Sequence, residues 1–175
     1  MSEPVNLVLV DAEDREIGVA EKLECHVGDG LLHRAFSVFV YGPDGRVLLQ
    51  QRSAAKPLWP MYWSNACCGH PLPGEDVPAA AERRTQEEFG IACQARFLYK
   101  FQYQARYSDG FSENELCHVF ESDYDGELAP DPAEIAAWRW ITPDELTREI
   151  ERHPERFSPW MKLEWAEIRR GRQAR

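Results

Sequence analysis

The stretch GHPLPGEDVPAAAERRTQEEFGI, residues 69–91, decides the fold. After a Gly-Glu-Asp step it is rich in alanine, glutamate and arginine, which favour an α-helix. Pro78 stands near the start of this run and Gly90 directly after it, where proline and glycine are favoured at the two ends of a helix. The stretch therefore predicts a helix over residues 77–89.

Apolar, β-rich runs lie on both sides of this helix. They predict strands over residues 6–11, 35–41, 46–52, 95–107, 113–124 and 137–141. The second and third runs are joined by the turn Gly-Pro-Asp-Gly at residues 42–45, with proline at its second position and glycine at its fourth. This turn is a strong hairpin signal.

Two further helices follow the last strand. A threonine cap followed by proline predicts a helix over residues 142–153. An amphipathic helix over residues 158–170 is expected to pack through Trp160, Leu163 and Ile168. Strands, one central helix, more strands and then helices indicate an α/β sandwich built on a mixed sheet.

Composition limits the classes of function. The chain has 175 residues, enough for one domain, so we expect a single domain over residues 1–175. A formal net charge of −10 argues against a nucleic-acid surface, which needs a basic stripe. The N-terminus lacks the basic and apolar regions of a signal peptide, and no apolar run reaches the roughly 18 residues of a membrane span.

The five cysteines are odd in number and show neither disulfide-framework nor zinc spacing. They suit reduced thiols in a cytoplasm. We expect a cytoplasmic monomer or weak homodimer that binds a small molecule and has no nucleic-acid or membrane partner.

Two adjacent cysteines precede a histidine in the segment WSNACCGHP, residues 63–71. Successive residues of an extended strand point to opposite faces, so only one of Cys67 and Cys68 can line a site with His70. We expect that residue to be Cys68, with Cys67 as a small buried hydrophobe. A local bulge in the backbone would reverse the two roles.

Histidines and glutamates supply candidate metal ligands. Glu113 and Glu115 stand two apart on a predicted strand and share a face. His26 and His33 flank a glycine-rich loop, and His70 follows the cysteines. Such a nitrogen and oxygen site without thiolate suits Mn²⁺ or Mg²⁺, and Zn²⁺ could also occupy it. A solvated strand face would explain the two glutamates equally well. The other two histidines, His118 on the opposite strand face and His153 at a helix end, are expected to be structural.

The spacing of Gly69, Glu75, Arg83, Glu87, Glu88, Gly90 and Ile91 resembles the Nudix box, G-x5-E-x7-R-E-U-x-E-E-x-G-U with U an apolar residue. Thr85 departs from it where an apolar residue is usual. Arg84 departs from it where the box has a glutamate that helps to hold magnesium for hydrolysis. A plainer explanation is an exposed helix laced by Arg–Glu ion pairs, since Arg84 and Glu88 share a helix face.

With this altered box, the segments AFS, QQRSAAKPLWP, WSNACCGHP, ENE and FSPWM make the chain resemble the type I isopentenyl diphosphate isomerases, from about Val8 through Trp160. The resemblance implies a Nudix-like α/β/α sandwich with a mixed sheet. It also implies interconversion of isopentenyl and dimethylallyl diphosphate in isoprenoid biosynthesis, with divalent metal and proton transfer at carbon in place of hydrolysis.

The resemblance assigns roles residue by residue. The metal ligands of the family fall on His26, His33, His70, Glu113 and Glu115. The catalytic cysteine is Cys68, and Glu88 matches the glutamate that helps to bind a second, diphosphate-bound Mg²⁺. The cations that hold the diphosphate match Lys22, Arg52, Lys56 and Arg84. The aromatic residues beside the reacting carbon match Tyr103 and Trp160.

Moving the double bond needs a proton donor and a proton acceptor on opposite sides of the substrate. We expect Glu115, assisted by Tyr103, to protonate isopentenyl diphosphate, and Cys68 as thiolate to remove a proton from C2; the residues leave the reverse assignment open. A metal on Glu115 would make its proton more acidic. Trp160 would face the cation, although an amphipathic helix also explains a packed tryptophan.

Two other functions fit parts of the sequence. One is a Nudix hydrolase of nucleotide or other diphosphates, against which Arg84 and the Cys-Gly-His segment speak. The other is a binding module for metal or diphosphate without turnover, which would need neither Cys68 nor Glu115.

Overall fold

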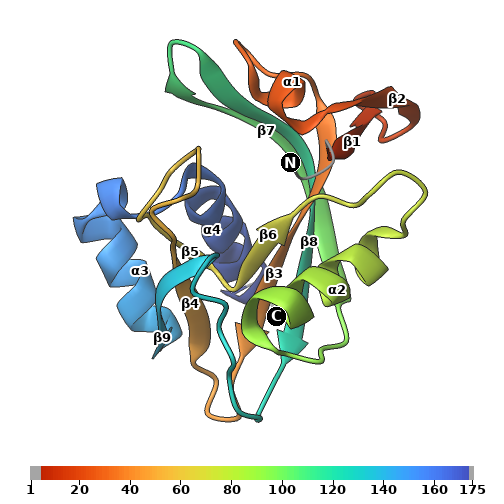
Figure 1. Cartoon of the computed structure of the whole chain (residues 1–175). Helices are drawn as coiled ribbons and strands as arrows, with labels where there is room; N and C mark the ends of the chain where they lie inside the picture. The colour runs from red at the N-terminus through yellow and green to blue at the C-terminus, as the bar shows by residue number, and fades with distance from the viewer. Residues whose placement is uncertain (1–4, 174–175) are drawn as a thin grey trace.

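A computed structural model describes residues 5–173 of the chain. In it the β-rich runs come together in one nine-stranded mixed sheet (Figure 1). The strands are β1 Asn6–Val10, β2 Glu16–Glu21, β3 His33–Tyr41, β4 Val47–Arg52, β5 Trp63–Asn65, β6 Cys67–Gly69, β7 Arg96–Ser108, β8 Phe111–Asp123 and β9 Ile135–Ile141. The helices are α1 Lys22–His26, α2 Val77–Phe89, α3 Pro143–Arg152 and α4 Pro159–Gln173, with a 3₁₀ turn at Pro154–Arg156. The predicted strands and helices are confirmed, whereas β2, α1 and the short β5 gave no sequence signal.

The central strand is β3. It runs parallel to β8 from the pair His33–Glu115 to the pair Tyr41–Asp123, and antiparallel to β6 on its other side. Apart from Arg34, every residue of β3 is buried. A strand covered on both faces reads as a nearly continuous apolar run, which is what residues 35–41 show.

The predicted turn after β3 forms, but it does not begin a regular hairpin. Gly42 and Gly45 make its backbone hydrogen bonds, and β3 pairs with β4 only at Tyr41–Val47. Beyond that pair the strands separate, because β4 takes β5 and β9 as neighbours. The turn therefore serves as the point where the sheet divides.

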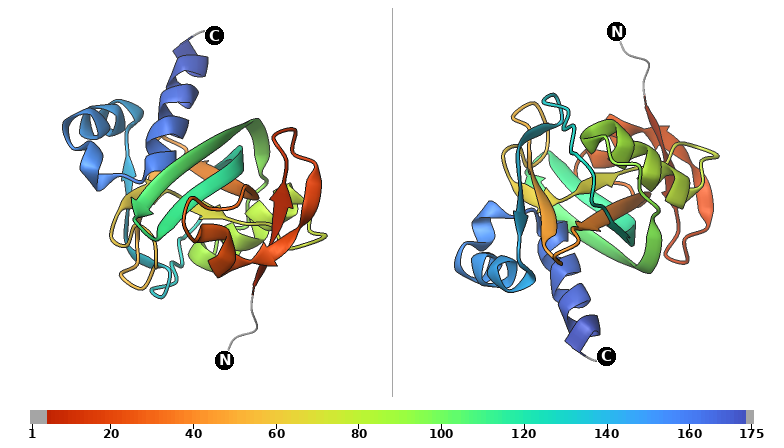
Figure 2. Two further views of the ribbon diagram at one scale, coloured as in Figure 1. Left: turned by 90° about the horizontal axis from the view of Figure 1, so that it is seen from above. Right: turned by 90° about the horizontal axis from the view of Figure 1, so that it is seen from below.

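Helices cover both faces of the sheet (Figures 1 and 2). One face packs Phe36, Val38 and Cys67 against α2, and the other packs Phe39 and Cys117 against α4. The α/β/α sandwich with a mixed sheet is thus confirmed. Within residues 5–173, no helix has the length and apolar character needed to cross a bilayer.

Helix α2 begins and ends where the sequence predicts. Gly90 ends it in the left-handed region at φ 70°, and a Cβ there would lie 2.9 Å from the Cβ of Ala129. Glycine is therefore required both by the backbone conformation and by the close approach. Arg83 donates to both carboxylate oxygens of Glu75 at 2.7 and 2.9 Å, which ties the preceding loop to the helix.

The packing predicted for the last helix is wrong at one position. Trp160 and Ile168 are buried, but Leu163 is 51% exposed. Met161, Glu164 and Trp165 complete the buried face of α4 instead. At 100° per residue these five positions form one stripe, and residue 163 falls on the other side of the helix.

Glu164 is a carboxyl group within the core. Its side chain is fully buried; Oε1 accepts from the Cys117 thiol at 3.5 Å, and Oε2 has no partner. Burial raises the pKa of Glu164 to about 8. The folded protein therefore keeps this proton over a pH range in which the unfolded chain has lost it.

We predict that Glu164→Gln stabilises the protein increasingly as pH rises from 5 to 8. Because the folded-state pKa lies above the ordinary value of 4.5, the wild type loses about 1.4 kcal/mol of stability per pH unit between the two values, and a neutral amide does not. Urea unfolding at several pH values measures the difference. Glu167→Gln, at a position of α4 where the side chain is 46% exposed, retains Glu164 and should keep the wild-type slope; parallel wild-type and Glu164→Gln curves would contradict the prediction.

Candidate active site and metal centre

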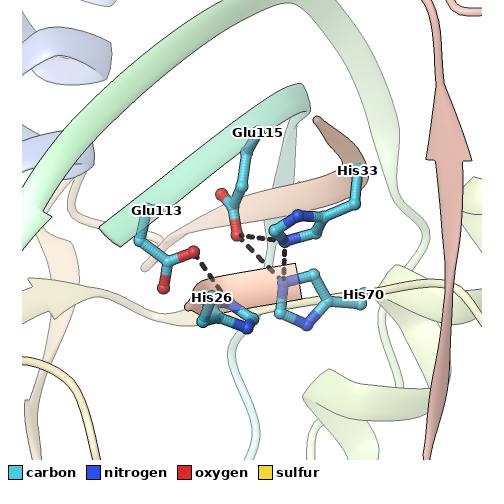
Figure 3. A group of neighbouring side chains, drawn as sticks. All are labelled: His26, His33, His70, Glu113 and Glu115. Atoms are coloured by element: carbon cyan, nitrogen blue, oxygen red, sulfur yellow. Dashed lines mark hydrogen bonds and ion pairs between the residues drawn. The ribbon is translucent and has the colours of Figure 1, made fainter. Parts of the chain in front are cut away.

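Five side chains that are far apart in the sequence meet in one cluster. They are His26 from α1, His33 from β3, His70 just after β6, and Glu113 and Glu115 from β8. One nitrogen or oxygen atom of each lies within 4.8 Å of those of the others. In Figure 3 the imidazole rings and the carboxylates point toward one another. The structure therefore brings together all five predicted ligands.

The strand register places three of them. His33 lies opposite Glu115 in the parallel β3–β8 ladder, and Glu113 is on the same face of β8. The loop that follows His26 is held against β8, because Asn114 Nδ2 donates to the Gly30 carbonyl at 3.1 Å. Gly30 has φ 78°, and a Cβ there would lie 3.2 Å from the Cβ of Asn114, so only glycine fits.

Backbone carbonyls fix the tautomers of two histidines. His26 Nδ1 lies 2.6 Å from the Lys22 carbonyl, and His33 Nδ1 lies 2.8 Å from the Leu31 carbonyl. Since a carbonyl can only accept, each Nδ1 carries the hydrogen and each Nε2 presents a lone pair to the cluster. Burial lowers the pKa of His70 to about 3, so this imidazole is neutral. Burial acts to lower the pKa of His26 as well, but the bond to Glu113 and the charge of Glu113 outweigh it and raise the pKa.

The facing atoms fit a divalent cation. His33 Nε2 lies 3.2 Å from His70 Nε2, and His26 Nε2 lies 2.9 Å from Glu113 Oε2, an oxygen with no hydrogen-bond partner. Burial and the charge of Glu115 raise the pKa of Glu113. Lone pairs and buried carboxylates at such distances repel one another unless a positive charge lies among them. Three imidazoles and two carboxylates suit a borderline to hard metal ion.

Cys68 lies on the same sheet face as the cluster. It pairs with Ser37 of β3, and its Sγ donates to Asn65 Oδ1 at 3.0 Å and accepts from Trp160 Nε1 at 3.1 Å. Burial and the nearby Glu164 raise its pKa to about 12. The resting thiol therefore keeps its proton at neutral pH.

Cys67 points the other way. It is fully buried in the cluster of apolar side chains beneath α2. The β3–β6 ladder pairs Phe36, Ser37 and Val38 in order with Gly69, Cys68 and Cys67, without a bulge. The predicted orientations of the two cysteines are confirmed.

Two aromatic residues connect Glu115 with Cys68. Tyr103 donates its hydroxyl to Glu115 Oε2 at 2.6 Å, and Trp160 donates to Cys68. The two aromatic rings lie 6.5 Å apart between centroids, and both side chains are buried. The Glu115 carboxyl and the Cys68 thiol are thus linked through two neighbouring aromatic side chains that are shielded from solvent.

Three of the four predicted cations gather near Glu134. Glu134 pairs with Lys56 and lies 3.4 Å from Arg84. The third, Lys22, is exposed at the surface; partial desolvation and the positive charges of Lys56 and Arg84 lower its pKa. Arg84 also donates to the buried Glu88 at 2.7 Å.

Arg52 lies apart from this group. Its guanidinium donates to the carbonyls of Trp59 and Leu58 at 3.0 and 2.8 Å and stands 5.1 Å from the Trp160 ring centroid. The Arg52 guanidinium is therefore held in place beside Trp160. The alternative of an exposed helix with Arg–Glu ion pairs is partly right. Arg84 does form ion pairs with Glu87 and Glu88, but the Glu88 side chain is buried.

Sequence reasoning missed several polar residues of this region. They are Ser37, Gln50, Ser64, Asn65 and Glu134. Ser37, Gln50, Ser64 and Asn65 lie within the segments AFS, QQRSAAKPLWP and WSNACCGHP, which could have pointed to them, whereas Glu134 has no such signal. Only the register and the loops bring them to the site. The other predictions for single histidines hold in their geometry: His118 pairs with Asp14 on the opposite face of β8, and His153 ends α3.

Comparisons with known proteins agree with this arrangement. A family model described as NUDIX domain matches residues 31–162. The chain is 47% identical to an isopentenyl-diphosphate Delta-isomerase of Burkholderia multivorans, over 88% of this chain and 87% of that protein. It is 42% identical to isopentenyl-diphosphate Delta-isomerase 1 of Photorhabdus laumondii, over 93% and 94% of the two chains. The crystal structure of DR0079 from Deinococcus radiodurans superposes with a TM-score of 0.68 over 84% of this chain and 89% of that one, and at 21% identity the likeness is one of fold.

We predict that Glu113→Gln weakens Mn²⁺ binding at least tenfold without destabilising the metal-free protein. The amide removes a ligand charge, but it also removes a buried carboxylate that lacks a hydrogen-bond partner at Oε2. Isothermal titration with Mn²⁺ and melting in the presence of chelator measure the two effects. Glu155→Gln, an exposed control outside the cluster, should change neither; unchanged Mn²⁺ affinity in Glu113→Gln would contradict the assignment.

Proposed function

The chain belongs to the isopentenyl-diphosphate Delta-isomerases, which share the NUDIX domain, and we propose that it interconverts isopentenyl and dimethylallyl diphosphate by adding a proton at one carbon and removing one at another. The observation that carries the proposal is the placement of Cys68 and Glu115 on one sheet face, next to Trp160 and Tyr103. Hydrolysis of a phosphoanhydride needs no such pair.

We assign the metal site to His26, His33, His70, Glu113 and Glu115. Mn²⁺ or Mg²⁺, and Zn²⁺ as a further candidate, match a set of three imidazoles and two carboxylates. When bound there, the ion would make a proton on the Glu115 carboxyl more acidic. The fixed tautomers of His26 and His33 support the assignment, because they turn Nε2 inward before any ion arrives.

The proton transfers fall to Glu115 and Cys68. In the direction from isopentenyl to dimethylallyl diphosphate, Glu115 would deliver the proton with help from the Tyr103 hydroxyl, and the Cys68 thiolate would remove one from C2. The reverse direction uses the same groups in opposite protonation states. The half-buried Cys68 thiol, with a pKa of about 12, is a strong base once ionised.

Trp160 and Tyr103 would protect the carbocation between these two steps. Both are buried, so water is kept from a cation that it would otherwise trap. The face of an indole stabilises a desolvated cation by about 2 kcal/mol or more. Trp160 is also fixed in place, since its Nε1 donates to both Cys68 and Ser64.

The diphosphate end of the substrate would bind Lys22, Arg52, Lys56 and Arg84. Glu88, buried and bonded to Arg84 and Gln50, would contact the Mg²⁺ that accompanies the diphosphate. Arg84 stands where a hydrolase of this fold keeps a metal-binding glutamate, so a cation replaces a magnesium ligand at the phosphates. This exchange favours holding the diphosphate over cleaving it.

The proposal includes a single domain over residues 1–175, acting in the cytoplasm as a monomer or weak homodimer. The five cysteines form no disulfide. The net charge of −10 supports a small-molecule enzyme over one that binds nucleic acid or an anionic membrane.

The test of the reaction is an incubation with isopentenyl diphosphate and Mg²⁺ or Mn²⁺ in deuterated water, followed by NMR. We expect dimethylallyl diphosphate with deuterium in a methyl group and no release of phosphate. Phosphate release without label in the hydrocarbon would mean a hydrolase. Binding of isopentenyl diphosphate with neither isomerisation nor phosphate release would mean that the protein binds the diphosphate without catalysing a reaction.

The adjacent cysteines give a matched pair of variants. We predict that Cys68→Ala lowers kcat by roughly 10²–10⁴-fold, because it removes a proton-transfer group, while substrate binding is retained. Cys67→Ala should keep kcat within a few fold and lower the melting temperature, since Cys67 only packs beneath α2. Titration calorimetry and the NMR assay separate binding from turnover, and loss of turnover in Cys67→Ala alone would reverse the assignment.

A further inference from the structure

Glu134, which carries no motif, lies where the diphosphate is proposed to bind. One carboxylate oxygen pairs with Lys56, and the other lies 3.4 Å from Arg84. Two of the four cations assigned to the substrate are therefore already in contact with an anion of the protein itself. A phosphate oxygen that reaches them has to compete with Glu134.

The backbone fixes the position of this carboxylate. The backbone N–H of Ser53, directly after β4, donates to the Glu134 carbonyl at 3.0 Å, and the N–H of Glu134 donates to the Asp131 carbonyl at 3.0 Å. Asp131 in turn donates to the carbonyl of Glu88 in α2 at 2.8 Å. The segment before β9 is thus tied both to the strand that precedes Lys56 and to the helix that carries Arg84.

Glu134 is ionised and only partly screened by solvent. Its side chain is 27% exposed, and those of Lys56 and Arg84 are 23% and 25% exposed. Burial acts to raise the pKa of Glu134, but the bond to Lys56 and the charges of Lys56 and Arg84 outweigh it and lower the pKa. A full negative charge is therefore present at neutral pH in a partly desolvated place, where charges interact more strongly than in bulk water.

A second carboxylate shares the same cation. Arg84 Nη2 contacts Glu88 at 2.7 Å and Glu134 at 3.4 Å, so one guanidinium nitrogen serves two acids. A metal-free diphosphate would bring several more negative charges to this place. A magnesium ion relieves the repulsion, because it binds one or two carboxylates together with phosphate oxygens.

We propose that Glu134 is a specificity-determining residue of the diphosphate subsite, which competes with metal-free diphosphate for Lys56 and Arg84 and, together with Glu88, favours the Mg²⁺-bound form. The inference rests on the proposed function, because that function assigns the cations to the diphosphate.

The test compares the binding of inorganic pyrophosphate with excess Mg²⁺ and with chelator, by titration calorimetry on the whole chain. In wild type, we expect Mg²⁺ to tighten binding strongly. In Glu134→Gln, the affinity for metal-free pyrophosphate should rise by roughly tenfold and that for the Mg²⁺ form should not, so the ratio of the two affinities falls. Glu134→Asp, which keeps the charge, should largely restore the ratio.

Glu87→Gln is the matched control. Glu87 also pairs with Arg84, at 2.6 Å, but its side chain is 45% exposed. An exposed pair competes weakly, so this variant should change the ratio less than about twofold. Circular dichroism and melting curves establish that each variant is folded.

The outcomes separate the inference from the function beneath it. Wild type that binds pyrophosphate neither with nor without Mg²⁺ would remove the proposed diphosphate subsite. Wild type that binds, with an unchanged ratio in Glu134→Gln, would overturn the role of Glu134 alone. Equal weakening of both forms would overturn it as well, because Glu134 would then only hold Lys56 and Arg84 in place.

Discussion

The parallel pairing of β3 with β8 is the constraint on which the rest of the site depends. It sets His33 opposite Glu115 and keeps Glu113, Glu115 and Cys117 on one face. Two parallel strands need a crossover between them, and here residues 42–110 supply it. That crossover contains Cys68, His70 and the whole of α2, and the antiparallel pairing of β6 with β3 then brings the thiol and the third imidazole to the same central strand.

A second constraint is that the charged groups of the site are buried. His33 is fully buried, and Glu88, Glu113 and Glu115 are nearly so. Buried ionisable groups are stable only when each faces a partner of opposite charge or a hydrogen-bond donor. The cluster meets that condition only in part: carbonyls orient two imidazoles and a tyrosine donates to Glu115, but Glu113 Oε2 has no hydrogen-bond partner. The same burial keeps the thiol of Cys68 protonated and excludes water from the place where a cation would form.

The proposed diphosphate subsite and the proposed site of proton transfer share contacts through Trp160. Arg52, assigned to the diphosphate, stands over the ring of Trp160, and the indole nitrogen of Trp160 contacts Cys68. Arg84, which is also assigned to the diphosphate, lies between Glu88 and Glu134. Positioning of the diphosphate and positioning of the reacting carbon thus depend on neighbouring side chains, which is what precise proton delivery to carbon needs.

The sequence by itself determined the local structure and pointed to most residues of the proposed site. The helix of residues 77–89, the glycine that ends it and the long strands follow from propensities and periodicity, which act between near neighbours. The facing of Cys68 away from Cys67 follows from the alternation of a strand. Only the tertiary structure decided what depends on long-range pairing: the separation of β3 from β4, the exposure of Leu163, and the arrival of Glu134 between Lys56 and Arg84. Register and loop closure set these positions, and neither leaves a pattern in the residues that it brings together.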